Sequence, residues 1–360
     1  MTGPDSKSTR RKRRLSTITW GAIPVVLLAG LVTVDRIPGT DISLTVPYAA
    51  QGPGPTFNTL GDVDGEPVIQ IDGAETDQTS GNLNMTTVSV RTNMTLAQAL
   101  GRWLLTDDSL VPIEQIIPPN VSEEEMQQSN EEAFVSSEAS ATVAAMNYLG
   151  RPTLVVVHDT VEDSAADGVI QANDIITSVD GADVTQPGKV QEIVRAKAPG
   201  DTVELGISRG DERLTEIIAL GEHPEDPSIP LLGITMTSEP ADDVSVSYNL
   251  NDIGGPSAGM IFSLAVIDKL SDGELNGGKF VAGSGTISED GTVGPVGGVE
   301  HKVIAAKEAG AELFLAPADN CANALSSDTG DMVIASVNTL DDAVTAMEAF
   351  ANGDEVATCR

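Results

Sequence analysis

One serine in the last third of the chain has the setting of a catalytic nucleophile. Ser257 lies in the segment GGPSAG (254–259), where glycines allow a tight loop and the proline favours the first turn of a helix. The apolar residues after it predict a buried helix over Ser257–Leu270, whose dipole creates positive potential at the serine. The backbone candidates to support an oxyanion are Gly255, Pro256 and Ala258. The alternative is that Ser257 only caps this helix.

Lys302 is the candidate base. The spacing of Val299, Val303 and Ala306 predicts a helix over Val299–Ala309 with one apolar stripe, and Lys302 flanks that stripe. Burial disfavours the charged amine and lowers its pKa toward that of a general base. The alternative is a lysine whose stem packs while its amine reaches water.

The histidines are poor candidates for the base. His158 ends an expected strand, His223 lies in a proline-rich segment, and His301 is expected on the solvent side of its helix. The run Gly255–Gly259 fits the letters of G-x-S-x-G, but the positions of the three histidines disfavour the Ser-His-Asp arrangement that uses that turn.

Several segments in order resemble the catalytic domain of Lon proteases. They are GGPSAGM, AGSGTISEDGTVGPVGG, VEHKVIAAKEAGA and FLAP with Asn320 shortly after, within about 232–350. The resemblance implies that Ser257 is the nucleophile and Lys302 the general base. Ser284 falls where Lon proteases carry a threonine that bonds the lysine, and hexameric rings common in that family make a homo-hexamer the expected assembly. Two positions depart from the pattern: Gly254 replaces an acidic residue and Glu300 replaces a basic one.

The residues before this region form a β-rich unit. Strands are expected at Thr153–Val157, Asn173–Gly181, Thr202–Ser208 and Leu214–Leu220, with a short helix at Val190–Lys197. The run DGVIQANDIITSVDGADV resembles the PDZ domains of bacterial proteases. That resemblance implies a groove that binds an extended peptide as an added strand. The alternative is a small β-rich spacer.

A basic cluster and an apolar segment stand at the N-terminus. The first 14 residues hold six Lys/Arg against one acidic residue, and residues 15–34 carry no charge. An apolar helix of this length spans a bilayer, and the positive-inside rule places the basic tail in the cytoplasm. We therefore expect a single-pass cell-membrane protein with an extracellular catalytic ectodomain. The alternative is a cleaved signal peptide.

The expected fold class is an α+β multidomain protein with an N-terminal transmembrane helix. The segment VPYAAQGPGPTFNTLG after the anchor strengthens the resemblance to PDZ-containing, membrane-anchored Lon-like proteases of Gram-positive bacteria. The predicted parts are a basic tail (1–14), the anchor (15–34), a linker and mixed α/β region (35–150), a PDZ-like domain (151–222) and a Lon-type α/β proteolytic domain (231–350).

The region 35–150 has no predicted chemistry. Its expected elements are irregular structure over 36–60, strands at Val68–Ile71 and Thr86–Arg91, a helix at Leu96–Leu105 capped by Thr95, and a helix at Ser137–Leu149. A proline-rich linker is expected at His223–Pro230. Further strands are expected at Ile234–Ser238, Val244–Tyr248, Lys279–Gly283, Leu313–Pro317 and Met332–Val337, with a helix at Leu340–Ala351.

Composition narrows the function classes. A net charge of -34 repels phosphates, so the chain is not expected to bind nucleic acid. Cys321 and Cys359 form no metal-binding cluster, and they are either one disulfide or two free thiols. The run Gly273–Lys279 satisfies G-x-x-x-x-G-K but continues with Phe280 instead of the Ser or Thr that holds magnesium, so no ATPase module is expected. The chain is also expected to use no metal and no cofactor.

The predicted function is that of a membrane-anchored serine endopeptidase acting on unfolded or membrane-proximal polypeptides. One alternative is a non-catalytic PDZ scaffold that recruits partner proteins at the cell surface. A second alternative is a regulatory protease that makes one specific cut in a membrane protein.

Overall fold

The computed structural model describes residues 30, 33–37, 39–40, 42–224, 226–242, 244–250 and 253–360. The chain divides into two compact units. The first comprises the described parts of Met1–Pro55 with Thr87–Met126, and the second comprises Thr56–Thr86 with those of Gln127–Arg360. The predicted basic tail lies outside the described residues, as does the predicted membrane span except for Gly30, Thr33 and Val34. Among the described residues, no helix combines the length and apolar character needed to cross a membrane.

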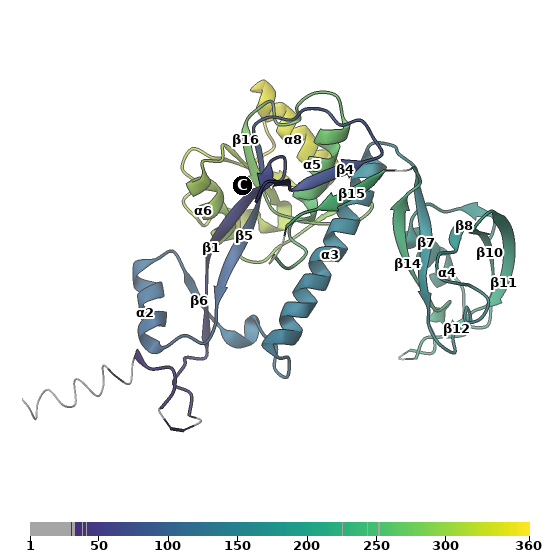
Figure 1. Ribbon diagram of the computed structural model, residues 1–360, viewed down its shortest axis with the longest axis horizontal. Helices are drawn as coiled ribbons and strands as arrows, with labels where there is room; N and C mark the ends of the chain where they lie inside the picture. The colour runs from purple at the N-terminus through teal and green to yellow at the C-terminus, as the bar shows by residue number, and fades with distance from the viewer. Residues whose placement is uncertain are drawn as a thin grey trace, which may run out of the picture. The chain divides into compact units, whose positions relative to one another are not determined.

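A mixed sheet is the centre of the second unit (Figure 1). Its strand order is β20-β19-β16-β5-β1. The strands are β1 (Tyr48–Asn58), β5 (Asn82–Arg91), β16 (Phe280–Gly283), β19 (Leu313–Pro317) and β20 (Val333–Val337). Strand β16 runs parallel to both β5 and β19, and β19 runs parallel to β20. The strands predicted at Lys279–Gly283, Leu313–Pro317 and Met332–Val337 are therefore present and adjacent, whereas the one predicted at Val244–Tyr248 pairs with β4 (Ile69–Asp72) in a separate two-stranded sheet.

Alternation along the strands separates two apolar cores, because successive side chains point to opposite faces of a sheet. Leu313 and Leu315 of β19 pack into the core beneath α3 (Glu123–Tyr148), α5 (Gly259–Leu270) and α8 (Leu340–Asn352). Phe314 and Ala316 of the same strand pack against α6 (Val299–Ala309) and α7 (Cys321–Ala324). The sheet is therefore covered on both faces, which fixes α5 and α6 against opposite sides of the strands.

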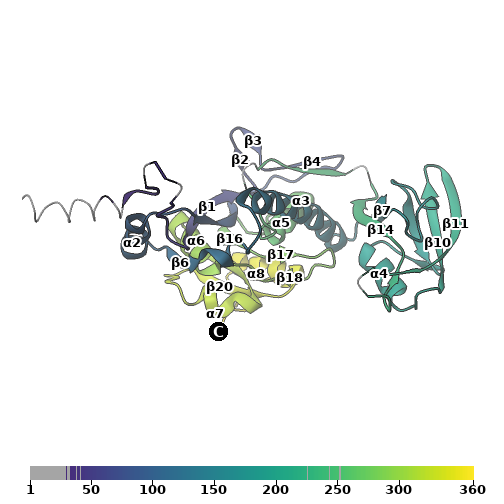
Figure 2. The ribbon, with the colours of Figure 1, turned by 90° about the horizontal axis from the view of Figure 1, so that it is seen from below.

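Helices α3 and α5 lie side by side (Figure 2). The Ser263 hydroxyl of α5 donates to the Ala141 carbonyl of α3, and the rings of Phe134 and Phe262 meet edge to face with centroids 5.7 Å apart. Short elements complete this unit: β2 (Asp62–Val63), β3 (Glu66–Pro67), β4 (Ile69–Asp72), β15 (Ser245–Tyr248), β17 (Thr286–Ile287), β18 (Val293–Gly294) and the 3-10 helix η2 (Ala318–Asn320).

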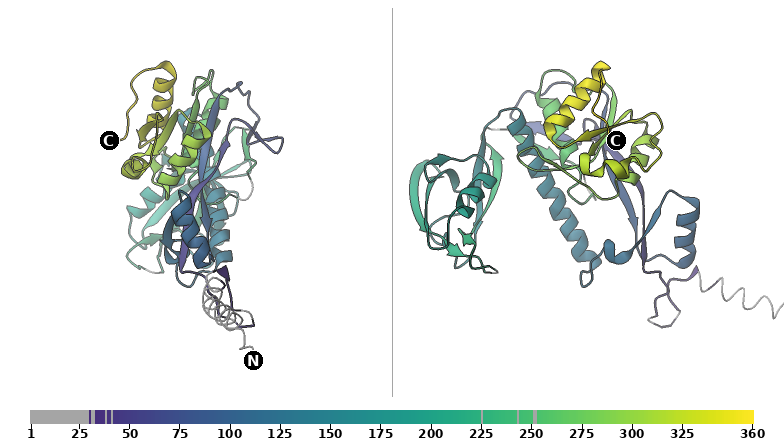
Figure 3. Two further views of the ribbon diagram at one scale, coloured as in Figure 1. Left: turned by 90° about the vertical axis from the view of Figure 1, so that its left-hand side faces the viewer. Right: turned by 180° about the vertical axis from the view of Figure 1, so that it is seen from behind.

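Residues 153–240 form a β-rich module with its own core (Figure 3, teal and green). Its sheet has the order β11-β10-β8-β7-β14, with α4 (Pro187–Arg195) contributing Val190 and Val194 to the core. The strands are β7 (Thr153–Thr160), β8 (Ile175–Val179), β9 (Ala182–Asp183), β10 (Thr202–Arg209), β11 (Glu212–Ala219), β12 (Gly221–Glu222), β13 (Pro230–Leu231) and β14 (Ile234–Pro240).

The first unit is small. The first half of β1 pairs with β6 (Ser109–Pro112), and a 3-10 helix η1 (Ile113–Gln115) follows. Helix α2 (Leu96–Leu105) begins at Thr95, which forms a capping box with Gln98 as the sequence predicts. The unit's own apolar cluster is limited to Ala50, Met94 and Ala99, with Val46 and Leu110 packed against them.

Two expectations of secondary structure are wrong, and one expected strand is present but pairs in a different sheet. Residues 48–58 are strand β1 instead of irregular structure. The glycines that suggested a loop allow close packing, since a Cβ at Gly54 would collide with the Thr87 hydroxyl. Helix α3 begins at Glu123, well before Ser137. The strand expected in the last domain at Ile234–Ser238 is β14, which pairs with β7 in the β-rich module.

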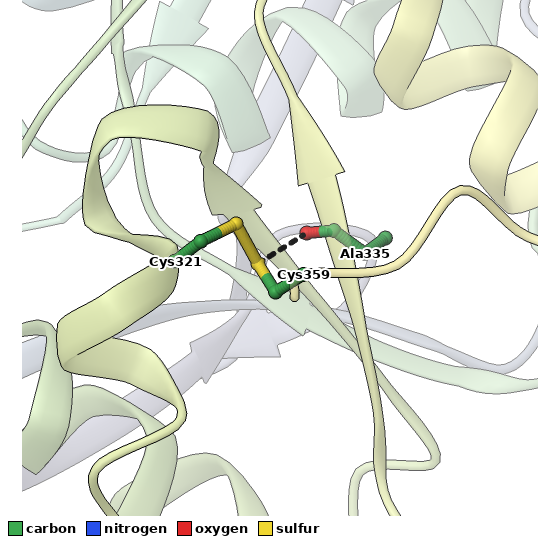
Figure 4. Close-up of a disulfide and its surroundings, with 3 residues drawn as sticks. All are labelled: Cys321, Ala335 and Cys359. Atoms are coloured by element: carbon green, nitrogen blue, oxygen red, sulfur yellow. Dashed lines mark hydrogen bonds between the residues drawn. A yellow bond between two sulfur atoms is a disulfide. The ribbon is translucent and has the colours of Figure 1, made fainter.

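The two cysteines form a disulfide (Figure 4). It joins Cys321 at the start of α7 to Cys359 in the C-terminal tail. The tail also hydrogen-bonds along β20, through the Cys359 N–H to the Ile334 carbonyl and the Ser336 N–H to the Ala357 carbonyl. The disulfide therefore holds the tail beside β20, next to the core that contains α6.

Replacing Cys321 and Cys359 together by serine is expected to lower the free energy of unfolding by about 2–4 kcal/mol, because the cross-link restricts the unfolded chain. Chemical denaturation of the oxidised wild type and the variant measures this difference. Reducing the wild type should reproduce the loss, whereas reducing the variant should change nothing. Equal stabilities of oxidised and reduced wild type would contradict the prediction.

Candidate active site

The structure brings together Ser257, Ser284 and Lys302, three of the residues that the sequence selects. The Lys302 Nζ atom of α6 lies 2.8 Å from the Ser257 Oγ and 2.7 Å from the Ser284 Oγ. Ser284 directly follows β16, and Ser257 directly precedes the amino end of α5. Segments from both faces of the sheet therefore meet at one amine.

Burial changes the chemistry of that amine. Lys302 is only 3% exposed. Removal from water disfavours the ammonium form and lowers the pKa of Lys302 to about 8. The alternative expectation, an amine that reaches water, is not what the structure shows. About a tenth of the amine is then neutral at pH 7, which gives the group the capacity to accept a proton.

The hydroxyl of Ser284 has a defined role in the hydrogen bonding. Its one proton is donated to the Ser257 carbonyl over 2.9 Å, so its lone pairs remain to accept from Lys302. The Gly285 N–H also donates to the Ser257 carbonyl, and the Met260 N–H donates to the Gly285 carbonyl. This ladder fixes the backbone of Ser257 against the segment that follows β16.

Helix α3 supports the serine loop from the other side. The Ser137 hydroxyl donates to the Pro256 carbonyl, and the Gly255 N–H donates to the Asn130 carbonyl at 2.8 Å. A Cβ at Gly254 would lie 2.8 Å from the Cβ of Asn130. The approach of α3 therefore requires glycine at the position where the Lon pattern has an acidic residue.

The predicted oxyanion support is only partly retained. Pro256 has no N–H to donate, and the Gly255 N–H is engaged by Asn130. Ala258 is the N-cap of α5, which begins at Gly259. The N–H groups of Ser257 and Ala258 therefore stand at the amino end of a buried helix, where the helix dipole is positive.

His301 is buried, 3% exposed, which contradicts its expected place on the solvent side of α6. The expectation assigned α6 a single packed stripe. The chain after α7 also contacts α6, since the Ser327 hydroxyl donates to the Glu300 carbonyl and Lys307 pairs with Asp328 at 2.7 Å. Helix α6 is therefore packed on more than the side that faces the sheet.

Asn320, Ser137 and Asn130 position the site, and the sequence indicated only the first of them. Asn320 accepts from the Val296 N–H and donates to the Val296 carbonyl, which fixes the loop that enters α6. It was visible as part of the Lon pattern, although without a role. Ser137 and Asn130 were missed because nothing in the sequence places α3 beside the serine loop.

A groove in the β-rich module is the second candidate site. A cavity of about 200 Å³ lies beside α4, where Val190, Val194, Leu232, Ile234 and Met236 supply apolar lining. Gln191, Arg195 and His223 supply its polar lining. Among the described residues, no three or more His, Cys, Asp or Glu side chains gather in a way that could hold a metal ion.

Comparisons with known proteins match these two regions. Residues 128–220 match the PDZ domain family, and residues 251–347 match the family described as Lon protease (S16) C-terminal proteolytic domain. The Lon protease of Phenylobacterium zucineum is 31% identical over 143 residues, which cover 38% of this chain and 17% of that protein. The Lon protease of Koribacter versatilis is 39% identical over 69 residues, which cover 19% of this chain and 8% of that protein. The chain thus spans less than a fifth of these curated relatives.

Solved structures of PDZ domains are similar to part of this chain. The PDZ domain of an SdrC-like protein from Listeria monocytogenes is 29% identical, with a TM-score of 0.21, covering 23% of this chain and 85% of that one. The corresponding domain from Listeria innocua is 27% identical, with a TM-score of 0.22, covering 23% of this chain and 92% of that one. From the family matches and the curated relatives, the protein contains a PDZ domain followed by a Lon C-terminal proteolytic domain and is a homologue of Lon proteases.

Proposed function

We propose that this protein is a serine endopeptidase in which Ser257 is the nucleophile and Lys302 the general base. The observation that carries the proposal is the buried amine of Lys302, 2.8 Å from the Ser257 hydroxyl oxygen. A hydroxyl becomes an effective nucleophile when an adjacent base removes its proton, and this distance is within the range such a transfer needs.

The hydrogen bonds set the order of proton transfers. The charged amine of Lys302 donates to the hydroxyl oxygens of Ser257 and Ser284. In the proposed neutral form one N–H stays bonded to Ser284, and the lone pair accepts from the Ser257 hydroxyl. Lys302 accepts the Ser257 proton as the serine oxygen attacks a peptide carbonyl. The resulting ammonium then gives that proton to the leaving amine, and water hydrolyses the acyl-enzyme with Lys302 again as base.

The tetrahedral intermediate needs hydrogen-bond donors for its oxyanion. The amino end of α5 supplies the N–H groups of Ser257 and Ala258 beside the reacting oxygen. The bonds from Ser284 and Gly285 to the Ser257 carbonyl hold that peptide unit in place before substrate arrives.

The substrates proposed are unfolded or membrane-proximal polypeptides. An extended peptide fits the edge of β14 beside α4, in the groove that PDZ domains use for added strands. The apolar lining of that groove favours an apolar side chain on the bound peptide. In this proposal the segment 15–34 anchors the chain in the cell membrane, with the protease and PDZ domain outside, and the assembly is a homo-hexamer.

Ser257→Ala and Lys302→Met are each expected to abolish cleavage of an unfolded protein such as casein, while the circular dichroism spectrum stays unchanged. Lys307→Met is the matched control, because Lys307 lies on the same helix but pairs with Asp328 at the surface. The control should retain wild-type activity. Full activity in folded Ser257→Ala or Lys302→Met would reject the mechanism and leave the non-catalytic scaffold as the better account.

The value of kcat/KM is expected to rise with pH up to about 8 and then level off, because only neutral Lys302 can accept the proton. Below that pH, each unit should lower the rate by about tenfold. Initial rates on a fluorogenic unfolded substrate measure this profile, with substrate stability checked at each pH. A profile that is flat from about pH 6 to 9 would contradict the assignment of Lys302 as base.

Lys302→Met is also expected to stabilise the fold, by about 2–3 kcal/mol at neutral pH, because it removes a buried group whose charged form is disfavoured. The pKa of Lys302 is lower in the folded protein than in the unfolded chain. Lys302 therefore lowers the free energy of unfolding by the full amount below pH 8, and this destabilisation is lost as pH rises above that value. Denaturation at several pH values should show the variant's advantage narrowing in alkaline solution, whereas Lys307→Met should show no such advantage.

A further inference from the structure

Helix α2 of the first unit (Figure 1) carries an exposed stripe of apolar side chains. Leu96, Leu100, Trp103 and Leu104 are spaced as neighbours on one helix face and are 43%, 41%, 60% and 66% exposed. The adjacent side of the helix packs inward through Ala99, which is 3% exposed. The stripe is therefore a surface that the first unit itself does not cover.

The composition of α2 differs from the rest of the chain. The chain as a whole holds 54 acidic residues, yet α2 contains none. Its one charged side chain, Arg102, pairs with Asp108 at 3.3 Å. A helix with Leu and Trp on one face and no acidic group resembles helices that lie in the interface of a bilayer, where tryptophan is enriched.

Backbone pairing ties this helix to the end of the predicted membrane span. The Leu44 N–H donates to the carbonyl of Asp35, the residue that follows the apolar segment 15–34. Thr45 in turn bridges to Thr95, the N-cap of α2, and the Val46 N–H donates to the Met94 carbonyl.

These pairings limit how far α2 can lie from the bilayer. Two adjacent strand spacings separate Asp35 from Thr95, about 10 Å in all. Helix α2 adds about 15 Å of length at ten residues. Every side chain of the stripe therefore lies within a few nanometres of the point where the anchor would leave the hydrocarbon core.

We infer that the α2 stripe is a membrane-docking surface, which inserts Leu96, Leu100, Trp103 and Leu104 into the headgroup and upper acyl region of the bilayer. The inference rests on the proposed anchor, whose exit point would bring the stripe close to the bilayer. An unfolded substrate has no comparable tether to α2, and the test below separates the bilayer from a second copy of the chain in the proposed hexamer. The docking gives the first unit a second contact with the membrane besides the span itself.

The two tryptophans of the chain allow the anchor and the stripe to be tested separately. Trp20 lies in the apolar segment and Trp103 in the stripe. The full-length protein is reconstituted into phosphatidylcholine vesicles as Trp20→Phe, which leaves Trp103, or as Trp103→Phe, which leaves Trp20. Lipids brominated near the carbonyl end of the acyl chain then quench a tryptophan that enters the interface.

Trp103 fluorescence is expected to be quenched by about half and shifted to the blue, as for other interfacial tryptophans. Leu104→Ser should abolish this quenching. Leu105→Ser is the matched control, because Leu105 is 84% exposed but faces away from the stripe, so quenching should persist. Neither substitution should alter casein cleavage or the quenching of Trp20.

The outcomes separate the two proposals. Unquenched Trp103 beside quenched Trp20 overturns the docking surface and leaves the anchor intact. Unquenched Trp20 overturns the anchor, and if Trp103 is also unquenched both proposals fail. Trp103 shielded from aqueous acrylamide without lipid, in an oligomer that Leu104→Ser dissociates, would assign the stripe to a second copy and overturn membrane docking.

Discussion

The placement of one amine between two hydroxyls is the constraint on which the rest of the catalytic region depends. Lys302 is almost entirely removed from water, and its contacts are the oxygens of Ser257 and Ser284. Neutral hydroxyls satisfy the N–H groups of a buried amine without favouring its charged form as a carboxylate would. The site can therefore hold a lysine in the interior and still leave it able to take up a proton.

That placement requires elements from separate parts of the chain to be fixed independently. Asn320 clamps the loop before α6 by pairing with both backbone groups of Val296. The segment after β16 bonds the carbonyl of Ser257, while Ser137 of α3 bonds the carbonyl of Pro256. Each of these contacts comes from a buried side chain, so the loop geometry and the hydrogen bonding of Asn320, Ser284 and Ser137 are satisfied together.

The sequence predicts the elements of the protease region well because their periodicity is strong. Helix α6 begins and ends where the Val299, Val303 and Ala306 pattern predicts, and Thr95 caps α2 as expected. Helix α3 was placed too late because its first half is exposed and polar, so it has no apolar stripe. The signal for its true start was present: Ser122 and Glu125 form reciprocal hydrogen bonds of the capping-box kind.

Some features of the fold depend on tertiary packing and cannot be predicted from the local sequence pattern. The proline and glycine residues of β1 indicate a loop by composition, yet the strand forms because its neighbours fill the space that side chains would occupy. The second packed side of α6 is contacted by residues more than twenty positions later, such as Ser327 against the Glu300 carbonyl. The same reasoning applies to α2: its capping and periodicity are readable in the sequence, but that its apolar face points outward could only be learned from the fold. An amphipathic pattern identifies the apolar face of a helix. The structure shows whether the protein's own core covers that face or leaves it exposed for a partner or a membrane.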